Sequence, residues 1–338
     1  MKVLLIGGTG VISTEITRLL SAQGHEVTLL NRGTRAADFP SARHIALDIS
    51  DEEAAQEALK GERFDVAADF ICFEPGQARR DIRLFSGKTG QFIFISSASA
   101  YQKPLSDAVI TESTPLHNPY WRYSQNKAKC EDILMEEYRK NGFPVTIVRP
   151  SHTFSERSLP VPVHGSKGAW AVVERMRAGK RVLVPGDGES LWAVMPSVGF
   201  APAFCGLCGN PHAIGQAVQI TGEEILTWNQ IMRSIASACG GQYLPCYVPS
   251  DLLAGAKSYD YTGALLGDKA NTVLFDNSKL HHLVPHLPPY PRFDQAVRRS
   301  VAWLDAHPEY RPSDPEFDAF CDRVCGIMDE AAKKIREM

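Results

Sequence analysis

The chain has 338 residues, of which 44% are hydrophobic and 22% are charged, and its formal net charge at pH 7 is −3. This length predicts two domains, or one large domain with a smaller one, and the nearly balanced charge argues against a global attraction to nucleic acid or to an anionic membrane surface. No stretch approaches the roughly 20 apolar residues that span a bilayer, so neither a nucleic-acid partner nor a membrane is expected.

The chain begins MKVLLIGGTG, in which one lysine and a short apolar run precede the glycines. That pattern predicts a buried strand rather than a signal peptide. We therefore expect a cytoplasmic protein whose eight cysteines are reduced thiols. Cys205 and Cys208 form a CxxC with no second pair at zinc-finger spacing. Packed thiols on an apolar helix are expected there, and no metal site.

Up to Pro150, short apolar runs alternate with helical patterns. Strands are predicted over residues 2–6, 26–30, 44–46, 66–71, 91–95 and 145–148. Helices are predicted over about residues 11–22, 51–59, 76–85 and 120–141. Alternation of this kind predicts a parallel sheet with helices on both faces. We expect a Rossmann-like, doubly wound α/β domain over residues 1–155.

After Pro150 the chain becomes richer in loops, as in SLPVPVHGSKG and LPPYPRF. Helices are predicted over residues 169–178, 228–238, 293–306 and 314–338. We expect residues 156–338 to form a smaller substrate-binding region that is interleaved with the first domain.

Gly7, Gly8 and Gly10 lie between the first predicted strand and the first predicted helix. Glycine permits a tight turn and a close approach of the backbone to a pyrophosphate, and the helix N-terminus offers free N–H groups to the anion. This position predicts a dinucleotide site in which Gly7, Gly10, Val11 and Ile12 contact the cofactor. The alternative is a glycine-rich turn without a ligand. Ser13 takes the place where a third glycine is common, and it is small enough to be tolerated.

The second predicted strand ends at Asn31 and Arg32. A site that selects NAD commonly has an acidic residue here, which binds the ribose hydroxyls. Without that acid, nothing repels a 2′-phosphate, and Arg32 could pair with it or stack on adenine. The sequence therefore slightly favours NADP over NAD, although Arg32 could also be a solvated loop residue. Asp48 and Ile49 end the next strand and are expected at the adenine edge.

Tyr123 and Lys127, in YSQNK, share one face of a predicted helix. A nearby ammonium favours the phenolate, so the pKa of the tyrosine falls and it can exchange a proton with a hydroxyl or carbonyl of a substrate. An exposed helical pair is the alternative. Ser97 and Ser99 follow the buried strand FIFIS, at the sheet edge where doubly wound folds bind ligands.

Five motifs in this order, GGTGVIS, LDISD, FISSASAY, ITESTPLHNPYWRYSQNKAKCE and VRPSHTF, resemble the extended short-chain dehydrogenase/reductase superfamily, in its NAD-dependent epimerase/dehydratase branch. The resemblance covers residues 1–155 well and the remainder more loosely. It implies that Tyr123 is the acid/base and that Lys127 lowers its pKa and holds the nicotinamide ribose. Ser97 would bind the substrate oxygen that becomes the carbonyl. The implied cofactor contacts are completed by Phe70, Pro150 and Ser151, the last two near the carboxamide.

Nucleotide-sugar members of that family usually carry an arginine and then an acidic residue after the GDG turn. Here Trp192 stands near the first position and Gly199–Phe200 near the second. A free or modified sugar, or another small polyol, is therefore expected as the substrate. Trp192 could stack on a sugar ring or belong to the core. The same stretch resembles the sub-branch that includes chloroplast stem-loop RNA-binding proteins.

Further substrate contacts are expected from Ser99, His152, His164 and Lys167. A polar, aromatic run is a further candidate, with Tyr259, Tyr261, Asp268, Lys269 and Asn277. Surface solvation or local capping is the alternative for these segments. We expect an NAD(P)-dependent oxidoreductase or epimerase/dehydratase that transfers hydride to or from a sugar-like hydroxyl or carbonyl. The alternative is a non-catalytic dinucleotide sensor or an RNA-associated protein of the same fold. Such a protein could lose Tyr123 or Lys127 without penalty, and this chain has both. The sequence leaves a homodimer open.

Overall fold

The computed structural model describes residues 1–34 and 38–338, and the chain divides into two compact units. The first unit comprises residues 1–153, 197–221 and 275–290, and the second comprises residues 154–196, 222–274 and 291–338. Two segments beyond residue 155 thus belong to the first unit, so the two units alternate along the chain. Strand β8 (His152–Phe154) crosses the first boundary between them.

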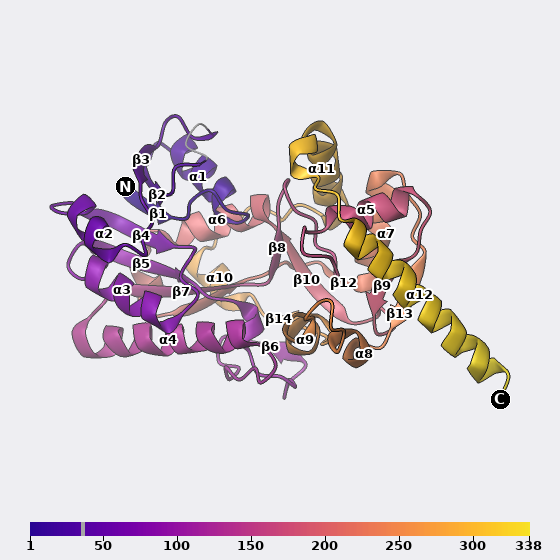
Figure 1. Cartoon of the computed structure of the whole chain (residues 1–338). Coiled ribbons are helices and arrows are strands. Elements are labelled where there is room, and N and C mark those ends of the chain that lie inside the picture. The colour runs from indigo at the N-terminus through magenta and orange to yellow at the C-terminus, as the bar shows by residue number, and fades with distance from the viewer. Residues whose placement is uncertain (35–37) are drawn as a thin grey trace. The chain divides into compact units, whose positions relative to one another are not determined.

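A seven-stranded parallel sheet, in the order β11-β7-β5-β4-β1-β2-β3, forms the centre of the first unit (Figure 1). Its strands are β1 (Lys2–Ile6), β2 (Glu26–Asn31), β3 (Arg43–Ala46), β4 (Phe64–Asp69), β5 (Thr89–Ile95), β7 (Val145–Pro150) and β11 (Ala217–Ile220). The strand order reverses between β1 and β4, and a doubly wound sheet binds its ligand beyond the carboxyl ends at such a point. The predicted fold class is confirmed.

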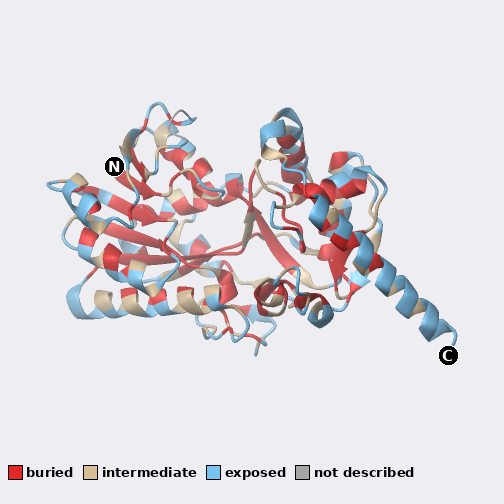
Figure 2. Cartoon of the chain, in the orientation of Figure 1, coloured by how far each residue is buried: buried red, intermediate tan, exposed pale blue. Residues whose placement is uncertain are grey.

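Helices cover both faces of this sheet, with α2, α3 and α4 on one face and α1 and α6 on the other (Figure 1). Their bounds are α1 (Ser13–Ala22), α2 (Glu52–Ala58), α3 (Pro75–Phe85), α4 (Arg122–Asn141) and α6 (Ser197–Leu207). The remaining short elements of this unit are η2 (Ala98–Ala100), β6 (Val109–Ile110), η3 (Pro211–Ala213), α10 (Ser278–Leu283) and β14 (Leu274–Phe275), which spans a boundary. Figure 2 shows the central strands as buried, as expected for strands that helices cover on both sides.

The sequence did not predict β11, which pairs with β7 although some 70 residues separate them along the chain. Its four residues, AVQI, are too few to show a period, and only pairing with the sheet makes them a strand. The preceding helix α6 is fastened to the sheet by Gln91. Its amide donates to Leu207 O at 3.0 Å and accepts a hydrogen bond from Gly209 N at 2.7 Å.

The second unit combines short strands with helices of varied length. They are α5 (Trp170–Arg177), β9 (Val182–Pro185), β10 (Leu191–Pro196), β12 (Ile225–Thr227), α7 (Trp228–Cys239), β13 (Pro245–Val248), α8 (Ser250–Ala254), α9 (Thr262–Ala264), the π-helical turn η4 (Leu265–Lys269), α11 (Phe293–Ala306), η5 (Pro308–Tyr310) and α12 (Pro315–Arg336). Strands β9 and β13 pair in parallel, and β10 and β12 pair antiparallel. The sequence predicted the longer helices and missed these strands, which are too short to show alternation.

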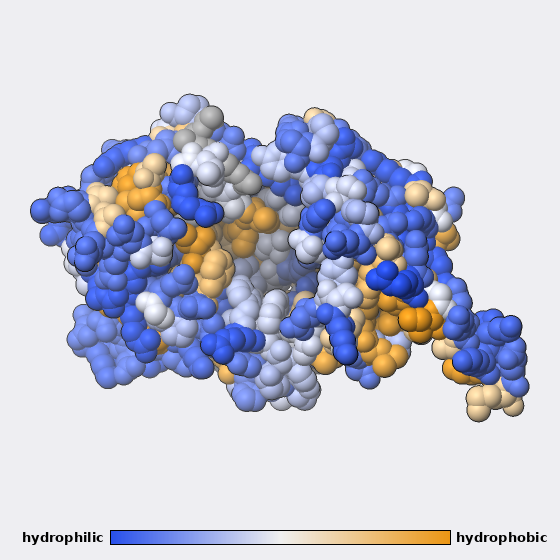
Figure 3. Space-filling model, viewed as in Figure 1, coloured by the Kyte–Doolittle hydropathy of each residue, from blue (hydrophilic) through white to orange (hydrophobic). Residues whose placement is uncertain are grey.

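A buried guanidinium anchors α12 to α5. Arg175 is almost fully buried and donates to Asp318 Oδ1 at 2.5 Å and to Asp322 Oδ1 at 2.7 Å. The last turns of α12 extend beyond this anchor and are exposed (Figure 2). Within the described residues no helix is long and apolar enough to cross a membrane, and Figure 3 shows mostly hydrophilic residues over the face that it views.

Candidate active site

The glycine turn after β1 has the geometry of a tight backbone loop. Gly7 has a φ of +75°, and a Cβ at this position would come within 2.7 Å of Ile71 Cγ2. Ser13 Oγ accepts a hydrogen bond from Gly10 N at 2.8 Å and donates one to Gly7 O at 2.7 Å. Ser13 is therefore more than a tolerated replacement for a third glycine, because its hydroxyl holds the two sides of the turn together.

A cavity of about 430 Å³ opens beside this turn, at the carboxyl ends of β1 and β2. Its lining consists of Gly7, Thr9, Gly10, Leu30, Asn31, Arg32, Thr34, Leu47, Asp48, Ile49 and Ile71. Six residues that the sequence proposed for the cofactor are among them: Gly7, Gly10, Asn31, Arg32, Asp48 and Ile49. The cavity thus lies where the strand order reverses and where a dinucleotide is expected.

Two buried polar atoms test whether a dinucleotide fits. Asn31 Oδ1 accepts a hydrogen bond from Gly33 N at 2.8 Å, but Asn31 Nδ2 has no partner in the described part of the chain. At the end of β7, Ser151 Oγ is also buried and has no partner among residues 1–34 and 38–338. Buried polar groups are nearly always hydrogen-bonded. Asn31 Nδ2 lies where the adenosine ribose is expected, and Ser151 Oγ lies where the carboxamide is expected. The residues present therefore fit a nicotinamide dinucleotide.

The remaining expected cofactor residues differ in their placement. Pro150 ends β7 beside Ile220 of β11, and Val11 and Ile12 precede α1, with Val11 exposed. The ring of Phe70 packs against Phe204 of α6, with 5.5 Å between the centroids. Ile71, the next residue, lines the cavity instead. Neighbouring side chains of an extended segment point in opposite directions, which explains the exchange.

Asp48 lies at the far wall of the cavity, where its carboxylate oxygen Oδ1 accepts hydrogen bonds from Ser50 N at 2.9 Å and Ser50 Oγ at 2.7 Å. These hydrogen bonds lower the pKa of Asp48, and the positive charge of Arg32 lowers it further. The carboxylate is therefore ionised at neutral pH and acts only as a hydrogen-bond acceptor.

Lys127 is 1% exposed, and its ammonium is held by backbone carbonyls. Nζ donates to Cys72 O and to Ile95 O, each at 2.6 Å. An ammonium has three N–H donors, so one remains for a ligand. Burial lowers the pKa of Lys127, and the neighbouring groups Cys72, Asp69, Cys130 and Glu131 oppose that shift.

Tyr123 is half-buried one helical turn before Lys127, whose Nζ lies 5.7 Å from the centroid of the Tyr123 ring. Trp121 and Phe73 flank this ring at centroid distances of 5.0 Å and 6.3 Å. The Phe73 ring is 44% exposed and lies 4.7 Å from Lys127 Nζ. The sequence analysis did not single out Phe73 or Trp121, since neither belongs to a catalytic pattern.

Ser97 lies at the end of a chain of hydroxyl groups. Ser124 Oγ of α4 donates to Ser99 Oγ at 2.7 Å, and Ser99 Oγ lies 2.8 Å from Ser97 Oγ. Ser97 Oγ also accepts from Ser99 N at 3.2 Å. Either hydroxyl of the Ser97–Ser99 pair can be the donor, and when Ser99 donates to Ser97, the hydrogen of Ser97 is available to a ligand. Ser99, itself proposed as a substrate contact, is buried and orients Ser97.

A buried polar network supports this edge of the sheet from below. Glu131 of α4 accepts hydrogen bonds from Ser96 Oγ at 2.5 Å and from Arg149 Nη2 at 2.6 Å. Arg149 Nη1 also donates to Tyr101 OH at 3.2 Å, and that hydroxyl donates to Gln219 Oε1 at 2.9 Å. Burial raises the pKa of Tyr101, so this tyrosine stays protonated and has a structural role.

The other expected substrate residues have local contacts. His152 is half-buried in β8. In the second unit, Tyr261 OH donates to His164 O at 2.8 Å, and Lys167 Nζ donates to Ser313 O at 3.1 Å. Trp192 is 2% exposed, and its ring lies 5.7 Å from that of Trp228. Of the two roles that the sequence left open for Trp192, the structure gives the core position, and the indole has no open face for a sugar.

Of the CxxC thiols, Cys205 lies in α6 and Cys208 follows directly after it. Cys208 is buried, and burial raises the pKa of Cys205 to about 12. No group of three or more His, Cys, Asp or Glu side chains that could hold a metal ion occurs in the described ranges.

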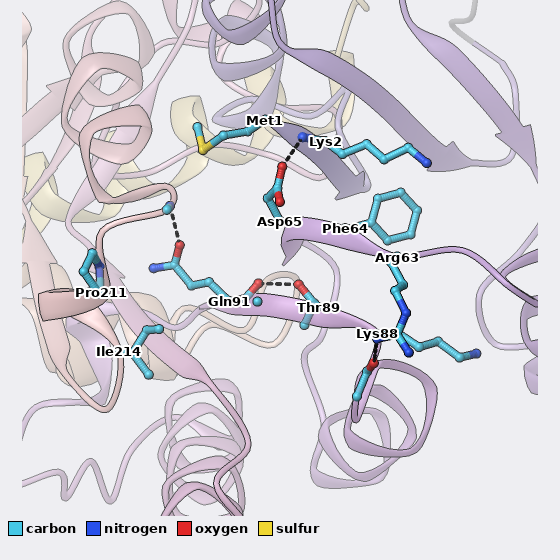
Figure 4. A pocket seen from close by; sticks show the side chains of 13 residues that line it. Met1, Lys2, Arg63, Phe64, Asp65, Lys88, Thr89, Gln91, Pro211 and Ile214 are labelled. Carbon is cyan, nitrogen blue, oxygen red and sulfur yellow. Dashed lines mark hydrogen bonds between the residues drawn. The ribbon is translucent and has the colours of Figure 1, made fainter.

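A larger hollow, of about 850 Å³, lies at the opposite, amino-terminal edge of the sheet (Figure 4). Its polar groups mostly bind one another. Lys2 N donates to Asp65 Oδ2 at 2.6 Å, and Arg63 Nη1 donates to Gly87 O at 2.6 Å. Size alone therefore does not identify the functional site, because the unsatisfied Asn31 lines the smaller cavity and neither Asn31 nor Ser151 lines the larger one.

The chain matches the model of the NAD dependent epimerase/dehydratase family over residues 3–80 and 82–214. It belongs to this family. The resemblance that the sequence motifs indicated is confirmed, and the family is one of enzymes, as expected.

Among its relatives is a chloroplast stem-loop binding protein of 41 kDa from Arabidopsis thaliana, which is 27% identical over 253 residues. That match covers 71% of this chain and 63% of the relative. The 2′-dehydrokanamycin reductase of Streptomyces kanamyceticus is 23% identical over 258 residues, covering 75% of this chain and 71% of the relative.

Among solved structures, the UDP-glucuronic acid 4-epimerase of Bacillus cereus, in complex with UDP-glucuronic acid and NAD, has a TM-score of 0.72. The identity is 15%, and the match covers 90% of this chain and 99% of the epimerase. At this low sequence identity, the structural similarity to the epimerase shows a shared fold alone.

The two glycines of the turn allow the phosphate site to be tested separately from the fold. A Cβ at Gly10 would meet only Ser13 Oγ at 3.4 Å and Gly7 O at 3.8 Å, whereas one at Gly8 would meet Leu29 Cδ2 at 2.6 Å. We expect Gly10→Ala to keep the wild-type Tm and to weaken NAD binding about tenfold or more, or by at least ~1.4 kcal/mol, in calorimetric titration. The matched variant Gly8→Ala should lower the Tm. Wild-type affinity in Gly10→Ala would refute the phosphate site.

Proposed function

We propose that this family member is an NAD(P)-dependent oxidoreductase or epimerase/dehydratase that acts on a hydroxyl or carbonyl of a sugar-like molecule. The observation that carries the proposal is the Lys127 ammonium, held at 2.6 Å by two carbonyls with its third N–H unused and Tyr123 one helical turn away. An isolated helical pair would have no reason to bury its lysine.

The bound nicotinamide supplies the carbon that accepts or gives the hydride. Tyr123 takes the proton of the substrate hydroxyl as that group becomes a carbonyl, and returns it in the reverse direction. Lys127 favours the phenolate by its charge and binds the ribose with its third N–H. Ser97 Oγ accepts a hydrogen bond from Ser99 N. With Ser99 as the donor of the bond between the two hydroxyls, the hydrogen of Ser97 binds the same substrate oxygen and holds it beside Tyr123.

The sugar-like substrate is supported by relatives whose names describe sugar chemistry. They include a UDP-glucose 4-epimerase of Lactobacillus helveticus, 30% identical over 169 residues. Whether the substrate carries a nucleotide is a finer point, and we propose that it does not. The segment that follows the GDG turn lacks the arginine and the acid of the nucleotide-sugar members and has Trp192 in the core.

An RNA-associated role is the competing proposal, because one relative is named as a stem-loop binding protein. The net charge of −3 argues against it, since binding to RNA depends on neutralising phosphates with lysine and arginine. The N–H that Lys127 leaves without an acceptor would also have no use in RNA binding.

Tyr123→Phe tests the proposed mechanism, because it removes the proton-transfer group and keeps the ring. We expect turnover to fall by roughly 10²–10⁴, while the affinity for the dinucleotide stays within a few-fold. The assay follows the absorbance of the reduced nicotinamide, and epimer formation by NMR, with neutral sugars, sugar acids and nucleotide sugars. Tyr138→Phe on the same helix is the matched control. Turnover at the wild-type rate in Tyr123→Phe would contradict the mechanism.

We also propose that the site accepts NADP at least as well as NAD. Arg32 lines the cavity, and the end of β2 carries Asn31 where an acid would repel a 2′-phosphate. Arg32→Ala should therefore weaken NADP binding more than NAD binding in parallel titrations. Arg83→Ala, at an exposed arginine of the same unit, should change neither. A wild-type protein that binds NAD tenfold more tightly than NADP would show this preference to be wrong.

A further inference from the structure

Lys269, in the second unit, is a buried cation that the proposed mechanism does not use. It is 8% exposed, and its Nζ lies 3.8 Å from Asp268 Oδ2. That separation is too long for a hydrogen bond. No other residue in the described part of the chain gives this ammonium an acceptor.

Two other buried cations in the described residues have hydrogen-bond acceptors. Lys127 Nζ has two carbonyl acceptors at 2.6 Å, and Arg175 has two carboxylates and two backbone carbonyls. The side chain of Lys269 is largely buried, and Nζ is not among the fully buried atoms that lack a partner, so the ammonium is open to a ligand. Holding a charge in such a place without a hydrogen bond from the protein costs free energy. Burial accordingly lowers the pKa of Lys269, and Asp268 opposes the shift.

The position of Lys269 is built firmly. Its carbonyl oxygen accepts hydrogen bonds from two indoles, those of Trp192 at 3.2 Å and Trp228 at 2.9 Å. It ends the π-helical turn η4, in which Ala270 N donates to Leu265 O at 2.9 Å. Single π turns are rare and occur frequently at functional sites. The ammonium is thus carried on a rigid backbone, unlike a surface lysine that has folded onto the protein.

What the ammonium lacks is hydrogen-bond acceptors rather than charge, because the Asp268 carboxylate already lies nearby. A neutral molecule with several oxygens satisfies that need. A carboxylate or phosphate would add a negative charge beside Asp268. A polyol fits this requirement better than an anion.

We propose that Lys269 is a ligand-binding residue of the second unit, whose ammonium donates hydrogen bonds to hydroxyl or carbonyl oxygens of a neutral, sugar-like molecule. The choice of a sugar-like molecule rests on the proposed function. That Lys269 binds a ligand is inferred from its ammonium and from the rigid turn that carries it, independently of the proposed function.

Lys269→Met in the full chain tests this, since methionine has a similar length and is apolar. We expect its Tm to equal or exceed that of the wild type, because the change removes a buried ammonium that has no hydrogen bond. Arg175→Met is the matched control, and its Tm should fall, because it leaves the partners of a buried cation unsatisfied. A Tm of Lys269→Met that falls as far as that of Arg175→Met would overturn the proposal.

Ligand binding is the second measurement. Methyl glucoside, glucuronic acid and UDP-glucose are titrated by saturation-transfer NMR in the presence of NAD. We expect methyl glucoside to bind the wild type, and to bind Lys269→Met about tenfold or more weakly, as for loss of a hydrogen bond to a charged group. Equal affinity in the two proteins, preference for an anionic probe, or no binding of any probe would overturn the proposal. Absence of hydride transfer in a protein that still shows the Lys269 effect would count against the proposed function alone.

Discussion

The candidate active site depends on the Lys127 ammonium, whose hydrogen bonds connect three parts of the first unit. It is a side chain of α4, and its two carbonyl acceptors belong to the end of β5 and to the segment that follows β4. The same segment supplies Ile71 to the cavity and Phe73 to the wall beside Tyr123. A buried charge of this kind is stable only while each partner stays in place. The position of Tyr123 is therefore coupled to the shape of the cofactor cavity.

At the carboxyl edge of the sheet, some polar side chains are fully hydrogen-bonded within the protein and others are not. Glu131, Arg149 and Tyr101 belong to the first group, and their hydrogen bonds connect α4 to the strands β5, β7 and β11. One N–H of Lys127 has no acceptor, and Asn31 Nδ2 and Ser151 Oγ have no partner among the described residues. Buried polar atoms without partners cost free energy in the isolated chain. All of these lie at the carboxyl edge of one sheet, which is the expected pattern for a site that is completed by a ligand.

The sequence predicted the parallel sheet, the glycine turn and the pairing of Tyr123 with Lys127, because each of these has a local pattern. It did not predict the acceptors of Lys127, since they are backbone carbonyls and any residue type supplies one. Strand β11 was missed for a related reason, because only its pairing with β7 makes it a strand. The sequence placed Lys269 in a polar, aromatic run that could contact the substrate, but it did not set this lysine apart from its neighbours. What distinguishes it is the absence of an acceptor in the described residues, which depends on tertiary packing.

The central claim is that the first unit binds a nicotinamide dinucleotide across the glycine turn and against Lys127. A crystal structure of the wild-type chain with NAD tests it most directly. The account predicts the pyrophosphate at the backbone amides that follow Gly7, the adenosine in the cavity beside Asn31, and a ribose hydroxyl at about 3 Å from Lys127 Nζ. Density for NAD at the amino-terminal edge of the sheet, or a bound ribose that does not contact Lys127, would contradict the account.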